Sequence, residues 1–287
     1  MTAYLLLIIK LAVVTLIFAI GLSSTWADLT YLWRRPGQLL RSIVAMYFVI
    51  PIVALVVLQI LTLPAGVELA LLVLAVSAGA PLLPRKLMKI GHEAYMLSLV
   101  VTSSAIAVVA VPIWLKVLRP LYGITTELQP IDVATLIAKS FIGPIALGVL
   151  IRWQLPRFAE AVADRLLAIG GAVLVGCALI LLAMNGHLLL EVGWRSLLAL
   201  AGLTLAALAI GHALGGPGGA DRTGLAIACA TRHVGIAMIV AASVPGPRTA
   251  VLIVAYLLAA AVVSVPYLLW RRKQPGTRQH PASASAG

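Results

Sequence analysis

Long apolar segments alternate with short breaks of proline, glycine and charge along almost the whole chain. Each segment is long enough to cross a hydrocarbon core of about 30 Å as an α-helix. The first begins at the third residue, and we expect it to be a retained span rather than a signal peptide. We therefore predict an all-α polytopic membrane protein with about nine transmembrane helices, at Ala3–Leu22, Leu39–Leu61, Val67–Pro84, Tyr95–Leu115, Ile131–Ile151, Leu166–Met184, Leu197–Leu214, Thr223–Ser243 and Thr249–Trp270.

The composition supports a membrane protein independently of the segment pattern. Hydrophobic residues make up 62% of the chain and charged residues 10%, against about 25% charged in soluble domains. Cys177 and Cys229 both fall in apolar segments, so we expect no disulfide framework. In a soluble protein the net charge of +12 would suggest binding to nucleic acid. Here the positive-inside rule explains it better, so the expected partner is the lipid bilayer and not nucleic acid.

Basic residues also predict how the protein is oriented. With the N-terminus outside, 14 of the 21 lysine and arginine residues lie on the inner side, 4 on the outer side and 3 within spans. Because cytoplasmic loops carry an excess of Lys and Arg, we expect an integral plasma membrane protein, in bacteria the inner membrane, with a cytoplasmic C-terminus. The tail, residues 274–287, is rich in Pro, Ser and Ala and is expected to be disordered there.

Arg232 and His233 stand in the middle of the eighth predicted span. Arg232 lies ten residues beyond Arg222, roughly 15 Å into the membrane at the helical rise per residue. All nine acidic residues fall at span ends or in loops, so no carboxylate is expected beside it. Its partner should be an anion that the protein binds, backbone carbonyls, or water. An ionisable residue at this depth usually marks a transport path, although an arginine that caps the carbonyls of an unwound helix is the structural alternative.

Two spans carry residues that should interrupt a helix. Ser77–Lys86 contains two prolines and a glycine, and Ala228–Ala237 contains a glycine after three polar residues. Both breaks lie in the last span but one of their halves and run in opposite directions, which is typical of inverted-repeat transporters with two discontinuous crossing helices. We predict an N-terminal repeat of four spans in residues 1–120 and a C-terminal repeat of five spans in residues 121–273.

Candidate substrate-binding residues are the polar and small residues at or opposite these breaks. His233 titrates near neutral pH when unperturbed and could carry a coupling proton. One alternative is that the hydroxyls of Thr231, Thr102 and Ser103 donate to their own helices. Arg85 could likewise be only a signal that sets membrane topology. We predict no catalytic residue, metal site or cofactor, and a substrate site made by Arg232, His233, Thr231, Ser77, Gly79, Thr102, Ser103 and Arg85.

At this point the chain resembles the bile acid:sodium symporter family. The similar segments run over most of the chain: Phe18–Leu22 followed by Trp33–Leu40, Pro51 in the next span, Ser77–Pro84, and Thr231–Ala237. The resemblance implies ten helices, or nine when the first is missing, in two inverted repeats, with a panel domain beside a core domain that contains the crossing helices. It also implies an organic-anion substrate, often carried with sodium.

The chain departs from the family pattern where relatives bind sodium. The family's glutamate matches Ala228, its Gln-Asn pair matches Arg232 and His233, and its Ser-Asn pair falls near Leu82–Leu83. Sodium, a hard cation, needs oxygen ligands, and most of them are replaced. We therefore expect a secondary transporter for a small organic anion that is not coupled to sodium in the usual way. The coupling ion would be a proton or none, with sodium as the weaker possibility.

Two other classes of function remain as alternatives. An anion-selective channel would also place arginine at a constriction. An intramembrane enzyme is less favoured, because neither paired aspartates nor an H-E-x-x-H motif occurs at mid-membrane depth. The sequence leaves open the identity of the anion, the direction of transport and the oligomeric state.

Overall fold

The structure is a computed structural model, and it describes residues 2–77, 93–122, 129–232, 237 and 248–274. Each of the nine predicted segments contains a described helix or part of one. The described elements are α1 (Thr2–Ser23), α2 (Trp26–Thr30), α3 (Pro36–Val44), the π-helical turn η1 (Ala45–Val49), α4 (Ile50–Ile60), α5 (Ala65–Val76), α7 (Glu93–Tyr122), α8 (Pro130–Ile137), the π-helical turn η2 (Ala138–Ile142), α9 (Gly143–Gln154), α10 (Pro156–Val192), α11 (Trp194–Leu214), α12 (Gly219–Thr231) and α14 (Arg248–Arg272).

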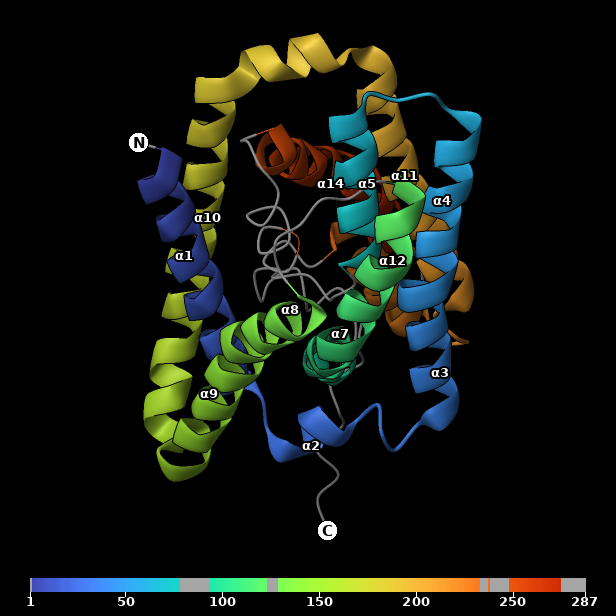
Figure 1. The fold of residues 1–287 in the computed structure, drawn as a ribbon. Helices are drawn as coiled ribbons and strands as arrows, with labels where there is room; N and C mark the ends of the chain where they lie inside the picture. Colours follow the sequence, from blue (N-terminus) through green and yellow to red (C-terminus); the bar gives the residue numbers. More distant parts are fainter. Residues whose placement is uncertain (1, 78–92, 123–128, 233–236, 238–247, 275–287) are drawn as a thin grey trace.

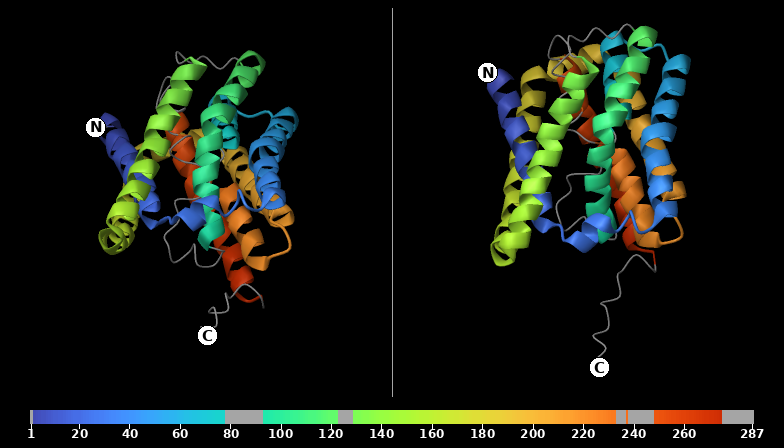
Figure 2. Two further views of the ribbon diagram at one scale, coloured as in Figure 1. Left: turned by 90° about the horizontal axis from the view of Figure 1, so that it is seen from below. Right: turned by 60° about the horizontal axis from the view of Figure 1, so that its bottom comes forward.

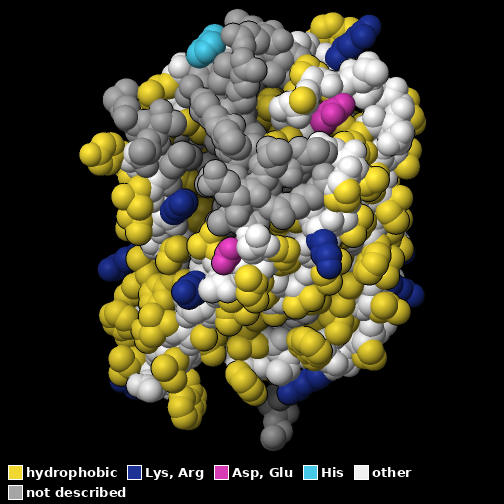
Figure 3. All heavy atoms as spheres, in the orientation of Figure 1, with side chains coloured by type: hydrophobic (Ala, Val, Ile, Leu, Met, Phe, Trp, Pro, Cys, Tyr) yellow, Lys and Arg dark blue, Asp and Glu magenta, His cyan; other side chains and the backbone are white. Residues whose placement is uncertain are grey.

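Long apolar helices confirm the prediction of an all-α polytopic membrane protein. In the described part of the chain, six helical stretches are long and apolar enough to span a bilayer, and Leu7–Ser23 and Ala65–Val76 are shorter apolar helices. Large apolar side chains point outward from them, including Trp153 at 80% exposure and Val262 at 71%. Hydrophobic side chains also dominate the described surface in Figure 3. Such a surface suits contact with lipid. The count of nine spans and the orientation stay predictions.

The helices divide into a smaller and a larger group. In the smaller group α1 packs along α9 and α10, at the left of Figure 1. In the larger group α11 packs on α12 and α14, and α5 packs on α4 and α14; Figure 2 shows the same division from two other directions. Contacts of α7 with α8, and of α10 with α14, join the groups. The division into repeats at residue 120 stays a prediction.

Two glycines let α1 and α9 approach almost to backbone contact. A Cβ added to Gly21 would lie 2.5 Å from the carbonyl oxygen of Ile145, and one added to Gly148 would overlap the carbonyl oxygen of Phe18. Small residues at such crossings allow close helix packing in membranes. The approach gives a physical reason for the glycine in the Phe18–Leu22 segment.

We expect Gly148→Ala to destabilise the protein, because its methyl group has no room against α1. Overpacking of this kind costs about 1–3 kcal/mol, and the melting temperature of the purified protein should fall. Gly143→Ala on the same helix is the control, since a Cβ there meets nothing within 4 Å and alanine favours helix over glycine by up to about 1 kcal/mol. Equal effects of the two substitutions would contradict the crossing geometry.

A proline reshapes the span that runs from Pro36 to Ile60. Pro51 has no N–H, so the carbonyl of Tyr47 four residues earlier loses its helical donor. The turn η1 lies directly before this position, and the indole Nε1 of Trp114 on α7 donates to the Tyr47 carbonyl at 3.0 Å. The proline thus creates a cross-helix bond that fixes α7 against this span.

α5 and α12 each end where the sequence predicts an interruption. α5 stops at Val76, and Ser77 leaves helical geometry with φ −77° and ψ 59°. α12 stops at Thr231, followed by Arg232 with φ 46° and ψ 167°. The residues after each break lie outside the described part of the chain. By contrast, α10 (Pro156–Val192) is much longer than the predicted span Leu166–Met184.

Candidate functional site

The site begins with the backbone of Arg232, which ends α12. Among the described non-glycine residues, only Arg232 has a positive φ. This conformation is uncommon for a residue with a Cβ and persists only where surrounding contacts hold it. The contacts of its side chain supply that restraint.

The guanidinium of Arg232 binds the carbonyl end of α5. Its Nε donates to the carbonyl of Leu74 at 2.8 Å, and its Nη2 donates to the carbonyl of Ala75. Its Nη1 lies 3.5 Å from the carbonyl of Met46 in η1. The side chain is only 1% exposed. Since the last four carbonyls of a helix have no partner within it, Arg232 caps α5 from the end of α12.

The site therefore places one cation where two helices present their carbonyl ends. Each helix end carries roughly half a negative charge, and these two ends lie together without a described carboxylate between them. The salt bridge present in the described residues joins Arg152 and Glu160, and Arg232 forms none there. The guanidinium offsets the negative potential of both helix ends.

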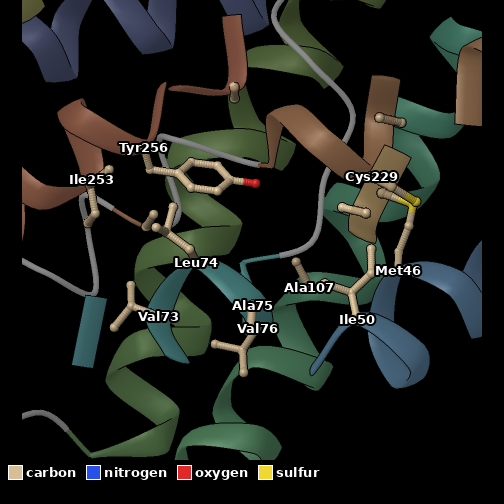
Figure 4. Close-up of a cluster of buried hydrophobic side chains, with 14 of the residues drawn as sticks. Met46, Ile50, Val73, Leu74, Ala75, Val76, Ala107, Cys229, Ile253 and Tyr256 are labelled. Carbon is tan, nitrogen blue, oxygen red and sulfur yellow. The ribbon is translucent and has the colours of Figure 1, made fainter. Parts of the chain in front are cut away.

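Tyr256 of α14 completes the capping of α12. Its hydroxyl donates to the carbonyl of Ala230 at 2.6 Å, and the side chain is fully buried. Figure 4 shows Tyr256 near Leu74 and Ala75 of α5 within one cluster of buried side chains. The sequence reasoning missed this residue. A tyrosine inside an apolar span, whose hydroxyl needs a partner when buried, was the available signal.

Tyr256→Phe is expected to lower the melting temperature, because the Ala230 carbonyl loses its donor while the ring still fills its place. An unsatisfied buried acceptor costs about 1–3 kcal/mol. Tyr4→Phe, on a ring that is 75% exposed, is the matched control and should leave stability unchanged. If both variants melt with the parent protein, Tyr256 is not a cap.

Ser77 and Thr102 are buried without hydrogen bonds to their hydroxyls. Ser77 directly follows α5 and is fully buried, Thr102 on α7 is 3% exposed, and neither hydroxyl finds a partner in the described residues. Ser104 Oγ, which the sequence reasoning did not select, is in the same condition. Buried polar groups normally have partners, so unpartnered hydroxyls mark places where a ligand or water is needed.

Thr231 and Ser103 instead bond their own helices, as one sequence interpretation held. Thr231 Oγ1 donates to the carbonyl of Ile227 at 2.8 Å, and Ser103 Oγ donates to the carbonyl of Val100 at 3.1 Å. The carbonyl of Ser103 also accepts from the Tyr47 hydroxyl at 2.5 Å, a contact that the sequence did not suggest.

One small cavity lies between α7 and the turn η1. Thr102, Ser103 and Met46 line a space of about 10 Å³, close to the least volume that holds one water. Met46 also offers its carbonyl to Arg232. The structure therefore brings the α7 hydroxyls next to the turn that Arg232 contacts, while His233, Gly79 and Arg85 lie outside the described residues.

This arrangement offers polar groups inside the protein but no metal-binding cluster among the described residues. In the part of the chain that the structure describes, no group of three or more His, Cys, Asp or Glu side chains could hold a metal ion. A buried guanidinium, capped helix ends and unpartnered hydroxyls can bind and orient a polar solute within the membrane.

Comparison with known proteins agrees with this picture. A search of curated proteins gave no match. A scan against protein families matches residues 10–192, more than half of the chain, to the Sodium Bile acid symporter family. The match covers α1 to α10, and Arg232 lies beyond it. By this match the chain belongs to the sodium bile acid symporter family, whose members are secondary transporters and not enzymes.

Proposed function

We propose that this family member carries a small organic anion and does not use sodium as its coupling ion. The observation that supports the proposal is the buried Arg232 guanidinium, bonded to the carbonyl end of α5. A fixed cation is already present where two helix ends would otherwise attract a mobile one.

The oxygen atoms around Arg232 explain why sodium would be excluded. A sodium ion at this place would need the carbonyl oxygens of Leu74, Ala75 and Met46 as ligands, and the guanidinium donates to these same atoms. A covalently attached cation also cannot cross the membrane with the substrate. Transport would then be uniport or proton-linked, with His233 as the candidate proton group.

The same charge favours an anionic substrate. Without Arg232, the two helix ends would make the site negative and repel an anion. With their potential offset, a carboxylate or sulfate can bind without a co-bound cation. A guanidinium has five N–H donors, and three carbonyls use one each; we propose that the anionic group accepts from the remaining edge. Thr231, Ser77, Gly79, Thr102, Ser103 and Arg85 remain the proposed residues around it.

A thermal-shift screen tests this proposal. Bile acids, steroid sulfates and small carboxylates are compared with neutral amide or alcohol analogues of the same size, in sodium-free buffer. We expect at least one anion to raise the melting temperature of the parent protein and of Arg34→Ala, a variant of an exposed residue, but not of Arg232→Ala. Equal stabilisation by the neutral analogues would contradict an anion site.

We further propose the orientation that the basic residues favour, with the N-terminus outside and the C-terminus in the cytoplasm of a bacterial plasma membrane. The last described turn of α14 supports it, because Arg271 and Arg272 end that helix. Inverted repeats at residues 1–120 and 121–273 belong to the same proposal, since α5 and α12 are both interrupted at their C-terminal ends.

A further inference from the structure

A polar pocket lies between the start of α3 and the turn that links α11 to α12. Its volume is about 320 Å³, and its lining includes Arg35, Gln38, Arg41, Gly216 and Asp221. It is separate from the Arg232 site, whose contacts lie in η1 and at the ends of α5 and α12. Two arginines against one aspartate leave the pocket with a net positive charge.

The pocket combines a buried amide donor that has no acceptor in the described residues with two exposed arginines. The amide Nε2 of Gln38 is buried and has no partner among the described residues. The side chain of Arg41 is exposed and forms no hydrogen bond or ion pair with them. The guanidinium carbon of Arg35 lies 4.0 Å from the centre of the Tyr31 ring, and this side chain is also exposed, so its N–H groups are accessible to a ligand. A buried amide donor without an acceptor is costly, so a ligand that accepts hydrogen bonds would stabilise the pocket.

The backbone adds positive potential. α3 begins at Pro36 with no side-chain cap and no acidic residue in its first turn, so its positive end is not offset locally. Gln38 stands in that first turn. On the opposite wall, Gly216 has φ 89°, and a Cβ there would lie 3.6 Å from Nη1 of Arg41, so a side chain at this position would narrow the pocket.

Asp221 is the one acidic residue that lines the pocket. Its position at the start of α12 explains why a carboxylate stands there. It stands in the first turn of α12, where a carboxylate offsets the positive end of that helix. It also has interactions of its own. Asp221 therefore neutralises part of the charge at α12 and leaves the donors of α3 without a partner.

We propose that this pocket binds a phosphate-type oxyanion, supplied by free phosphate or by the headgroup of an anionic lipid. Guanidinium groups bind phosphate oxygens in pairs of charge-assisted hydrogen bonds, and the Gln38 amide provides a further donor. The bound anion connects α3 to the α11–α12 turn. It stabilises the protein whichever solute the carrier moves, so the site does not depend on the proposed function.

The test measures melting temperature of the purified full-length protein in two arms. In the first, inorganic phosphate is titrated into detergent-solubilised protein, with sodium chloride at matched ionic strength as reference. In the second, the protein is reconstituted in vesicles of phosphatidylcholine with or without phosphatidylglycerol. The variants are Arg41→Gln, which removes a guanidinium, and Gln38→Glu, which replaces the donor by a carboxylate of the same shape. Arg34→Gln, whose residue does not line the pocket, is the control.

We expect phosphate or phosphatidylglycerol to raise the melting temperature of the parent and of Arg34→Gln. Both pocket variants should need about tenfold more of the anion for the same shift, or lose the shift entirely. Stabilisation by phosphate identifies a free anion as sufficient, and stabilisation by phosphatidylglycerol alone identifies a headgroup. The proposal is overturned if neither probe exceeds the chloride reference, or if Arg34→Gln loses as much as Arg41→Gln.

Discussion

Arg232→Leu is expected to abolish anion uptake and to destabilise the protein by several kcal/mol. The substitution removes the donors from the carbonyls of Leu74, Ala75 and Met46 at once. Each buried acceptor left without a partner costs about 1–3 kcal/mol. It also leaves the negative ends of α5 and α12 facing one another with no cation between them. The two effects act on the same site, so stability and transport should fall together.

Arg232→Lys separates the charge from the geometry. An ammonium keeps the positive charge but lacks the planar fork that serves several carbonyls at fixed angles. We expect stability between those of the parent and Arg232→Leu, with weakened uptake that is still independent of sodium. The melting temperature measures stability, and uptake into proteoliposomes measures transport. Arg34→Leu is the control for loss of an exposed arginine. Full stability and full uptake in Arg232→Leu would contradict the capping role.

Introducing a carboxylate at position 228 and removing the guanidinium at position 232 is expected to change the coupling ion. Ala228 is fully buried on α12, one turn before Arg232, and we propose that it takes the position of the sodium-binding glutamate that the family resemblance implies. In the parent background Ala228→Glu should abolish anion uptake, because the carboxylate pairs with the guanidinium and repels the substrate. Ala228→Glu combined with Arg232→Gln replaces the fixed cation with oxygen ligands.

An inward sodium gradient should stimulate anion uptake by the combined variant at least about fivefold, within the usual range for coupling between sites. Ala228→Gln with Arg232→Gln is the matched control, since it has the same volume without the charge. If the control responds to sodium equally, the carboxylate is not the coupling ligand. If the combined variant folds and binds the anion without sodium, replacement of the cation is the wrong explanation.

The sequence predicted where α5 and α12 end because the causes are local. Prolines and a glycine follow Ser77, and polar residues surround Arg232 in an apolar span. It also predicted that no carboxylate would accompany Arg232, since the acidic residues all lie near span ends. Of the three possible partners, the structure shows backbone carbonyls. That an anion also binds there is our proposal.

The sequence did not reveal which carbonyls Arg232 would reach. Leu74 and Met46 are 158 and 186 residues away along the chain, and such pairings depend on how the helices pack. The Tyr256 cap and the Trp114 bond to Tyr47 were missed for the same reason. Local patterns indicate that a polar group needs a partner, but they do not identify it.

The length of α10 was also underestimated, for a different reason. The predicted span began at Leu166, after the charged residues near the start of the helix. Yet Ala159 and Ala163 are buried together with Leu22 of α1, so the first turns pack on one side and face solvent on the other. Mean hydropathy identifies the membrane-crossing part of such a helix but not its amphipathic extension.

The most direct test of the central claim is anion uptake into proteoliposomes, with an anion that the thermal-shift screen identifies. Uptake is measured with sodium outside and with sodium replaced by choline, at equal membrane potential. Arg232 as the fixed cation predicts saturable uptake at the same rate in both, together with counterflow when unlabelled anion is loaded inside. Uptake that requires inward sodium would contradict it.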